Sequence, residues 1–249
     1  MERKSGLRNS QIIFLGVCIA VATIVSSVIL SQAALKVMKF TKEVITVTGS
    51  AQKEIKSDFI VWQCSLSRRE ADLPTAYKKL KEDSAKVEAY LVARQISPEE
   101  MSAQQIYTET IYKKTADGKE TNEIQAYRLT QGIDVRSYDV DKVAGVSRES
   151  TELINQNIEF FSGSPEYFYT KLDELKVEML AKASENAKLR AQSMAEPTGN
   201  SIGLMRSARM GVFQITPVTS TDVSDYGNND TTSLVKKVMA VVTVSFAIE

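Results

Sequence analysis

The sequence predicts an α+β fold, in which long helices pack on one face of a mostly antiparallel sheet and a single N-terminal transmembrane helix precedes the sheet. Three observations lead to this prediction. Residues 12–30 are apolar and carry no charge. Several later segments alternate apolar and polar residues with the period of a strand, and others repeat apolar residues at helical spacing. Helices inserted among antiparallel strands in this way are typical of α+β domains.

The N-terminal segment has the length of a membrane span. At about 1.5 Å per residue, the run IIFLGVCIAVATIVSSVIL at 12–30 covers roughly the ~30 Å hydrocarbon core of a bilayer. Three basic residues precede it, Arg3, Lys4 and Arg8. We therefore expect residues 1–10 to be cytoplasmic, residues 11–35 to be the anchor and residues 36–249 to be exported. Three lysines on the far side weaken this charge bias, Lys36, Lys39 and Lys42.

A cleaved signal peptide is the alternative to an anchor. Ser31-Gln32-Ala33 has small residues at the spacing that suits cleavage after Ala33. The apolar run is longer than the core of about 7–15 residues that signal peptides use, so we expect the segment to be retained. A helix buried in a soluble protein would carry a polar stripe, which this run lacks.

The exported part is predicted to begin with two strands and a helix. Residues 43–51 are rich in β-branched residues and end near Gly-Ser, as strands do. Residues 58–69 alternate, which assigns Ile60, Trp62, Cys64 and Leu66 to a buried face. Asp72 has the features of an N-cap with Pro74 in the first turn, and apolar spacing extends this helix to about Gln95.

A hairpin, a second helix and a short strand follow. Residues 101–113 and 123–136 are predicted strands, joined by a polar turn at 115–120. Asp139 can cap the second helix. The predicted inner face of that helix consists of Val140, Val143, Ala144, Ser147 and Ile154. Residues 158–162 are a predicted short strand.

The longest helix of the exported part is predicted at Tyr167–Ala195. One stripe recurs at steps of three and four, formed by Leu172, Leu175, Met179, Ala183, Ala187, Ala191 and Met194. Because the stripe narrows from leucine and methionine to alanine, we expect its C-terminal end to lie close against its partner surface. Pro197 and Gly199 end the helix.

The chain is predicted to finish with two strands around a loop. Residues 202–215 are a predicted strand, and residues 216–232 are polar, contain proline and glycine, and indicate a mobile loop. Residues 238–248 are a predicted core strand. Its inward side chains are Val238, Ala240, Val242, Val244, Phe246 and Ile248.

The composition argues against catalysis. The chain has no histidine, which is the commonest general base and metal ligand. A Ser–Lys pair would be the remaining nucleophile and base, but no Gly-x-Ser-x-Gly elbow is present, and Ser162-Gly163-Ser164 is interpreted as a turn. Cys64 is interpreted as a small buried hydrophobe. The adjacent carboxylates Asp173-Glu174 and Glu99-Glu100 are interpreted as solvated charge. We therefore expect a non-enzyme and assign no catalytic residue.

No cofactor, metal or nucleic-acid site is predicted either. Gly199 and Gly203 follow a helix and precede a strand, the reverse of a phosphate-binding loop. Zinc would need clustered cysteine and histidine. Oxygen ligands for calcium occur in one loop without EF-hand spacing, at Asp222, Ser224, Asp225, Asn228 and Asp230, and a polar loop is the favoured interpretation. With 31 basic and 31 acidic residues, the chain has no clustered basic face for nucleic acid.

Aromatic residues leave one alternative open, a pocket for a small molecule or an envelope partner. The candidates are Tyr107, Tyr112, Tyr127, Phe160, Phe161, Tyr167, Phe168 and Tyr169. Packing in the core is the interpretation that we favour for them.

Four passages, taken in order, carry a family resemblance. They are ITVTGSAQKEIKSDFIVWQCSLS at 45–67, TAYKKLKEDSAKVEAYL at 75–91, YRLTQGIDVRSYDVDKVAGV at 127–146 and AKASENAKLRAQSMAEPTGNSIGLM at 181–205. Together they resemble the SIMPL domain family, which includes bacterial periplasmic immunogenic proteins, and the resemblance covers residues 43–249.

The resemblance implies an exported or membrane-anchored α+β protein. In a bacterium this would be a single-pass inner-membrane protein with its C-terminal domain in the periplasm, or a periplasmic protein after cleavage near Ala33. Some members form large oligomers, and some are linked to oxidative-stress tolerance. No catalytic residues are established for the family, so none are transferred.

Three functional hypotheses follow. The first is a non-enzymatic envelope protein that forms a homo-oligomer, with contacts at 115–120 and 216–232. The second is a binding module for a small molecule or a protein partner. The third is a histidine-free enzyme, whose best sign would be a buried lysine or carboxylate with a perturbed pKa in a cleft.

Overall fold

The computed structural model describes residues 3–249, without the side chains of residues 3–12 and 39–42. The chain forms two compact units. Unit 1 comprises Met1–Ser50, Leu180–Gly211 and Val241–Glu249, and unit 2 comprises Ala51–Met179 and Val212–Ala240. The prediction that residues 36–249 form one exported domain stays a prediction. The expected cytoplasmic segment at 1–10 lies partly outside the described residues, as do the side chains that set its charge.

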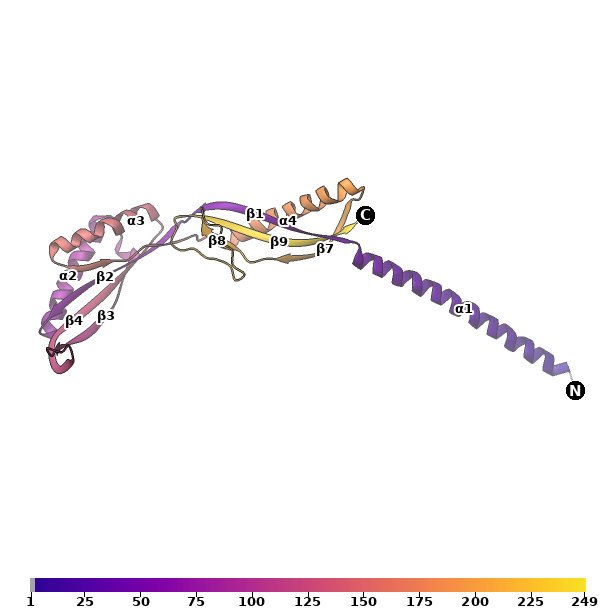
Figure 1. Cartoon of the computed structure of the whole chain (residues 1–249), viewed down its shortest axis with the longest axis horizontal. Helices are drawn as coiled ribbons and strands as arrows, with labels where there is room; N and C mark the ends of the chain where they lie inside the picture. The colour runs from indigo at the N-terminus through magenta and orange to yellow at the C-terminus, as the bar shows by residue number, and fades with distance from the viewer. Residues whose placement is uncertain (1–2) are drawn as a thin grey trace. The chain divides into compact units, whose positions relative to one another are not determined.

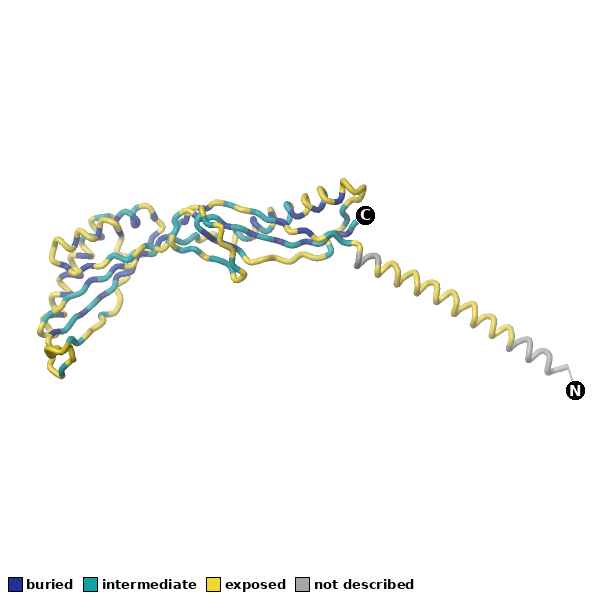
Figure 2. The backbone as a smooth tube through the Cα atoms, viewed as in Figure 1, coloured by how far each residue is buried: buried dark blue, intermediate teal, exposed yellow. Residues whose placement is uncertain are grey.

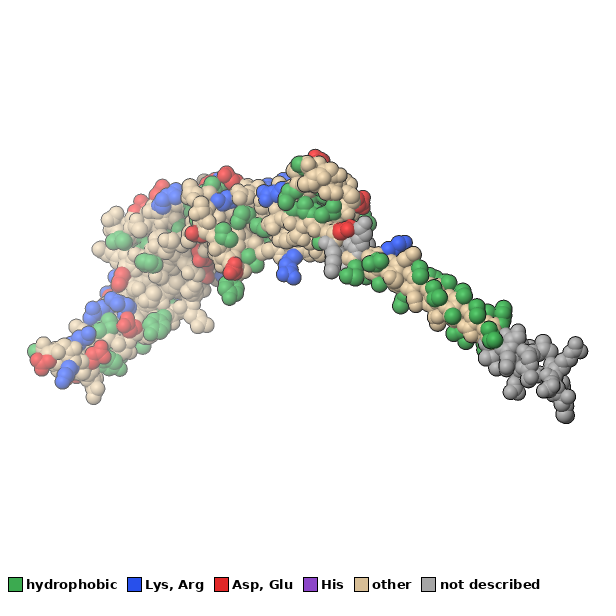
Figure 3. Space-filling view, turned by 45° about the vertical axis from the view of Figure 1, so that its right-hand side comes forward, with side chains coloured by type: hydrophobic (Ala, Val, Ile, Leu, Met, Phe, Trp, Pro, Cys, Tyr) green, Lys and Arg blue, Asp and Glu red, His purple; other side chains and the backbone are tan. Residues whose placement is uncertain are grey.

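The predicted N-terminal apolar helix is confirmed as α1 (Arg3–Lys42). Within it, the 26 residues Ile13–Met38 form a segment long and apolar enough to cross a membrane, and none of that segment is buried in the structure. Figure 2 colours the described residues of α1 as exposed along its length, and Figure 3 shows that the side chains on this helix are predominantly hydrophobic. Such a surface is unfavourable in water and suits lipid.

The predicted α+β class is confirmed, with two antiparallel sheets where one was expected. The first sheet has the order β1-β9-β7, and β8 also pairs with β9 (Figure 1). Its strands are β1 (Val44–Lys56), β7 (Ile202–Met210), β8 (Gln214–Pro217) and β9 (Val235–Ile248). The second sheet has the order β3-β4-β2-β5, and β6 also pairs with β2. Its strands are β2 (Phe59–Glu70), β3 (Met101–Lys114), β4 (Glu120–Ser137), β5 (Glu159–Ser162) and β6 (Glu166–Phe168).

Within residues 3–249, three further α-helices accompany the sheets, α2 (Leu73–Ala93), α3 (Val140–Glu149) and α4 (Leu172–Ala195). The same part of the chain has three short 3₁₀ helices, η1 (Pro98–Glu100), η2 (Ser150–Gln156) and η3 (Glu196–Thr198). Both predicted N-caps are present. Asp72 accepts a hydrogen bond from the backbone N–H of Thr75 at 3.0 Å, and Asp139 accepts one from that of Lys142 at 3.2 Å. These caps satisfy N–H groups that a helix start leaves unpaired.

The core of unit 2 lies between the second sheet and the helices α2 and α3. The predicted buried face of β2 is confirmed, since Ile60, Trp62 and Leu66 are fully buried and Cys64 is almost so. The Trp62 indole N–H donates to Ser162 Oγ at 3.1 Å, so its one polar group is satisfied inside the core.

The predicted close approach of the alanine end of α4 is confirmed. Ala183, Ala187 and Ala191 are fully buried, and Gly49 of β1 lies against the first two of them. A Cβ atom added at Gly49 would come within 3.0 Å of the Ala183 carbonyl oxygen and the Ala187 nitrogen. Strand and helix therefore touch backbone to backbone, which only small residues on both sides allow.

The same helix covers the outer edge of β1. The backbone N–H of Ile248 donates to Glu43 O, so by strand alternation the backbone groups of Thr48 and Ser50 face away from β9. Arg190 Nη1 donates to Thr48 O at 2.9 Å, and Ser50 N donates to Asn186 Oδ1 at 3.1 Å. Side chains of α4 thus satisfy an edge that would otherwise be open to pairing.

The structure corrects the predicted start of the long helix. Residues Glu166–Phe168 form strand β6, and α4 begins at Leu172. Backbone pairing decides this, because Tyr167 pairs with Ile60 and Phe168 with Phe59 on β2. The predicted stripe was also wrong at its end, since Met194 is 59 % exposed and Ala195 is buried instead.

Two smaller corrections concern spacing. Ile154 was predicted to face inward but is exposed, and Leu153 is buried in its place. The reason is that residues 150–156 form a 3₁₀ helix, whose three residues per turn shift the inward face. The strand predicted at 202–215 is divided into β7 and β8. Met210 pairs with Val242 and Gln214 with Met239, so the β7–β8 side has one extra residue between these two pairs, as at a β-bulge.

Candidate functional site

A buried lysine is the most unusual charged group of unit 2. Lys236 lies on β9 on the same side as Val238 and Ala240, and it is only 3 % exposed. Its ammonium donates to the Tyr167 carbonyl oxygen at 2.6 Å and to the Asp230 carbonyl oxygen. The side chain therefore joins β9 to β6 and to the end of the loop that follows β8.

Backbone bonds hold the surrounding segments in place. Ile215 N donates to Asn228 O at 2.8 Å, and Asp230 N donates to Ile215 O at 3.0 Å. Tyr167 N donates to Thr231 O at 2.7 Å. The end of the loop predicted at 216–232 is thus hydrogen-bonded to both β8 and β6, and the carbonyl groups that bind Lys236 have fixed positions.

Asp230 supplies a negative charge in the neighbourhood of the lysine. Its Oδ1 accepts from Thr232 N and Thr232 Oγ1, both at 2.8 Å, and from Ser233 N at 3.3 Å. Its Oδ2 is buried without a hydrogen-bond partner in the described part of the chain. Burial alone would raise the pKa of Asp230, but hydrogen bonds from Ser233 and Thr232 and the charge of Lys236 hold that pKa below its ordinary value.

The electrostatics of Lys236 follow from its burial. Loss of solvent lowers the pKa of Lys236, and the charge of Asp230 opposes that effect. Among the ion pairs of the described residues none involves Lys236, because no carboxylate lies within 4.0 Å of its nitrogen. The ammonium is therefore held by backbone dipoles rather than by a direct counter-ion.

A small cavity is lined in part by Lys236. Its volume is about 80 Å³, and its lining consists of Ile55, Tyr167, Phe168, Tyr169, Leu172, Ile215, Asn229 and Lys236. Sites for drug-sized ligands are usually about 300–1,000 Å³, so this cavity admits only a ligand of a few heavy atoms. The walls are mainly apolar and aromatic, and the lysine contributes the positive charge.

Three of the eight aromatic residues that the sequence suggested for a pocket line this cavity, Tyr167, Phe168 and Tyr169. Tyr107 and Phe161 are instead largely exposed, and Phe160 is buried in the core. Lys236 was not predicted. The signal for it was present, because extending the inward alternation of 238–248 by one step toward the N-terminus reaches position 236.

Several other residues considered from the sequence have structural roles. Ser162 Oγ donates to the Ser147 carbonyl oxygen at 2.8 Å, which ties β5 to α3. Glu100 accepts from Ser97 N at 2.8 Å in a capping box at η1, and Asp173 pairs with Lys176. Gly199 has a φ of 77° and ends η3 in the left-handed conformation that glycine favours.

The loop with possible calcium ligands borders an open recess of about 560 Å³. Asp222, Ser224, Asn228 and Asp230 belong to its lining. Among the described residues, no three His, Cys, Asp or Glu side chains are placed to hold a metal ion together. The absence of a metal site stays a prediction.

Burial should make Cys64 unreactive. Its thiol is 3 % exposed, and burial, with a smaller contribution from Asp134, raises its pKa from 9.0 to about 12. We expect the native thiol to react with a thiol reagent at pH 8 about 1,000-fold more slowly than in the unfolded chain, because the thiolate is the nucleophile. Mass spectrometry of the Cys18→Ser chain in detergent, with and without denaturant, measures this. Native and unfolded rates within tenfold of each other would contradict the buried position.

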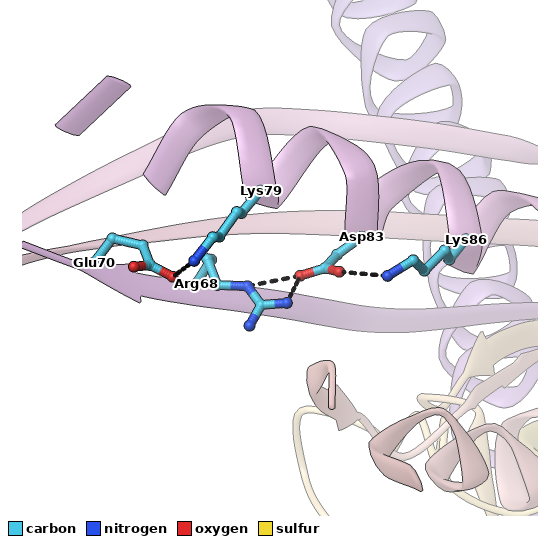
Figure 4. Close-up of polar contacts among 5 residues, drawn as sticks. All are labelled: Arg68, Glu70, Lys79, Asp83 and Lys86. Atoms are coloured by element: carbon cyan, nitrogen blue, oxygen red, sulfur yellow. Dashed lines mark hydrogen bonds and ion pairs between the residues drawn. The ribbon is translucent and has the colours of Figure 1, made fainter. Parts of the chain in front are cut away.

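A second cluster of buried charge joins α2 to β2 (Figure 4). Asp83 of α2 is 1 % exposed, and its Oδ2 accepts from Arg68 Nε at 2.8 Å and from Arg68 Nη2. Lys86 Nζ lies 3.3 Å from Asp83 Oδ1. Next to this pair, Lys79 and Glu70 form a more exposed ion pair at 2.7 Å. All of these groups have protein partners, so the cluster is a structural link and not a candidate site.

Comparison with known proteins concerns most of the chain that follows α1. A family model matches residues 45–246, that of SIMPL, described as a protein of unknown function (DUF541). A search of curated proteins gave no match. The matched region takes in strands and helices of both compact units, from β1 to β9. The resemblance inferred from the four sequence passages is therefore confirmed, and the chain belongs to the SIMPL family.

Proposed function

We propose that this protein is a non-enzymatic, single-pass membrane protein of the bacterial envelope whose SIMPL domain lies in the periplasm and self-associates. Two surfaces support the proposal, the apolar helix α1 and the outer edge of β7. The edge of β7 is the observation that carries it. A link to envelope or oxidative stress is part of the proposal only through the family resemblance.

The anchor has a face suited to contact with a second helix. Gly16, Ala20, Thr23 and Ser27 recur at steps of four and three along α1. Thr23 Oγ1 donates to the Ala20 carbonyl oxygen at 2.9 Å, so its hydroxyl is satisfied within the helix. In lipid, small residues at this spacing let two helices approach closely and gain van der Waals contact.

The outer edge of β7 differs from that of β1. β7 is the last strand in its sheet order, and Gly211 N donates to Val241 O. Strand alternation from that bond directs the backbone groups of Ala208 and Met210 away from β9. The exposed fractions of Leu204, Met205 and Met210 are 73 %, 60 % and 58 %. An edge strand with apolar side chains and free backbone groups is a template for pairing with another chain.

We expect the full chain, extracted in mild detergent, to form a uniform assembly by light scattering. Ala208→Pro should reduce that assembly to monomers at the same concentration, because proline removes an outward N–H that the β9 ladder does not use. Ala208→Ser keeps the N–H and serves as the matched control. A strictly monomeric wild-type chain would refute self-association, and an Ala208→Pro chain that assembles like the wild type would exclude this edge.

Intact mass in the same experiment tests the anchor. We expect the N-terminal segment to be retained in the membrane fraction. A soluble chain that begins near Ala34 would instead indicate cleavage of a signal peptide.

A second candidate function, binding of a small molecule, is favoured by the aromatic cavity at Lys236. A buried lysine with a lowered pKa is also the sign that we named for an enzyme. The described lining residues include no serine, threonine or cysteine nucleophile, and two backbone acceptors favour the ammonium form. We therefore assign Lys236 to ligand binding and not to catalysis.

A further inference from the structure

We propose that the cavity beside Lys236 binds a small monocarboxylate of about the size of acetate. This inference rests on the second candidate function given above and does not require self-association. The charge of the lysine, the size of the cavity and the residues of its walls support it.

The charge argument concerns the third N–H of the ammonium. A lysine ammonium has three donors, and Lys236 uses two of them on the carbonyl oxygens of Tyr167 and Asp230. Within the described residues, the third has no protein acceptor at hydrogen-bond distance. A buried charge without a direct counter-ion is costly, and an anion in the adjoining cavity would offset that cost.

The size of the cavity limits the anion. Its volume of about 80 Å³ is several-fold below the ~300–1,000 Å³ of sites for drug-sized ligands. A carboxylate of a few heavy atoms, such as acetate, suits a site of that size better than a long-chain or aromatic acid.

The walls select a carboxylate over an inorganic oxyanion. Ile55, Leu172 and Ile215 present apolar surface that a methyl group can contact. Asn229, Tyr167 and Tyr169, also in the lining, are residues with further polar groups. Phosphate or sulfate would place more charged oxygens against the apolar part of the walls than a carboxylate does, which is unfavourable.

The carboxylate of Asp230 is not the anion that we propose for the cavity. Its side chain is absent from the lining of the cavity, and its Oδ1 is already bound by Thr232 and Ser233. The Asp230 carboxylate is therefore bonded within its own turn and does not occupy the cavity.

The first test titrates the full chain in detergent with ¹³C-labelled acetate in a carboxylate-free buffer, followed by NMR. We expect saturable binding in roughly the millimolar to submillimolar range, as a ligand of about four heavy atoms allows. Acetamide has nearly the same shape without the charge and should bind at least tenfold more weakly. Benzoate has the charge but exceeds the volume and should not compete. Absence of saturable binding, or equal affinity for acetate and acetamide, would overturn the proposal.

Matched variants locate the site. Lys236→Met should weaken acetate binding at least tenfold. Lys237→Met should bind like the wild type, because Lys237 Nζ donates to the Ser220 carbonyl oxygen and lies outside the cavity lining. If Lys237→Met loses binding as fully as Lys236→Met, the assignment to this cavity is wrong.

Hydrogen exchange of the wild-type chain keeps the test independent of variant folding. Acetate should slow exchange at 166–172 and 228–236, and protection confined to other segments would overturn the site.

The Ala208→Pro chain separates this inference from self-association. It should bind acetate with wild-type affinity even where it no longer assembles.

Discussion

Replacing Gly49 with alanine is expected to lower the free energy of unfolding of unit 1 by about 3 kcal/mol or more, near the upper end of overpacking effects. The added methyl group would collide with the backbone of α4 at Ala183 O and Ala187 N, and with Ala187 Cβ at 2.7 Å. Backbone atoms of a helix cannot rotate aside as the end of a long side chain can, so strand and helix must separate. Hydrogen exchange of α4 and β1 amides, with thermal unfolding in detergent, measures the loss.

Two comparisons make this prediction specific. Gly145→Ala in α3 adds the same methyl group where nothing lies within 4 Å, and it should stabilise by about 0.5–1 kcal/mol because alanine is the better helix former. Combining Gly49→Ala with Ala187→Gly removes one colliding methyl but leaves the backbone contacts, so it should recover little. Full recovery would show that the constraint lies in the side chain of Ala187 and not in the helix backbone.

Asp83→Ala should destabilise unit 2 by about 3 kcal/mol, in the range found when one partner of a buried ion pair is removed. The loss comes from leaving the Arg68 guanidinium without its carboxylate against α2. Because the Arg68 side chain is 25 % exposed, part of its charge can reach water, which places the expected effect at the low end of the range. Urea unfolding followed by Trp62 fluorescence measures it.

The neighbouring pair in Figure 4 provides the control. Glu70→Ala removes the partner of Lys79 on the same strand and helix, but both groups reach solvent, so it should cost about 1 kcal/mol or less. The double variant Arg68→Met and Asp83→Leu should recover most of the stability, because apolar residues can replace a buried pair without leaving a charge unpaired. Equal losses for Glu70→Ala and Asp83→Ala would contradict the difference in burial.

Part of the candidate site was foreseeable from the sequence. Tyr167, Phe168 and Tyr169 were named as pocket candidates, and they line the cavity. They were, however, assigned to the start of a helix, and Lys236 was not among the predicted residues. Its carbonyl partner Tyr167 lies 69 positions away along the chain. Nothing in the residues around Lys236 indicates that partner.

The sequence by itself determined the features that depend only on residues close together along the chain. The uncharged run gave α1, the alternation in 58–69 gave the buried face of β2, and Asp72 and Asp139 capped their helices as predicted. The narrowing of the α4 stripe to alanine indicated a close contact before Gly49 could be identified as its partner. Periods of 2 and 3.6 residues and local capping are short-range properties, so they can be recognised in a single sequence.

Only the tertiary structure decided what depends on distant backbone groups. The residues at 166–168 fit the start of a helix and a strand equally well. Their pairing with β2 makes them a strand. The same holds for the division into two sheets, for the α4 side chains that cover the β1 edge, and for the carbonyl oxygens that hold Lys236. Each is fixed by the need of a buried polar group to find a hydrogen-bond partner, and such a partner can lie anywhere along the chain.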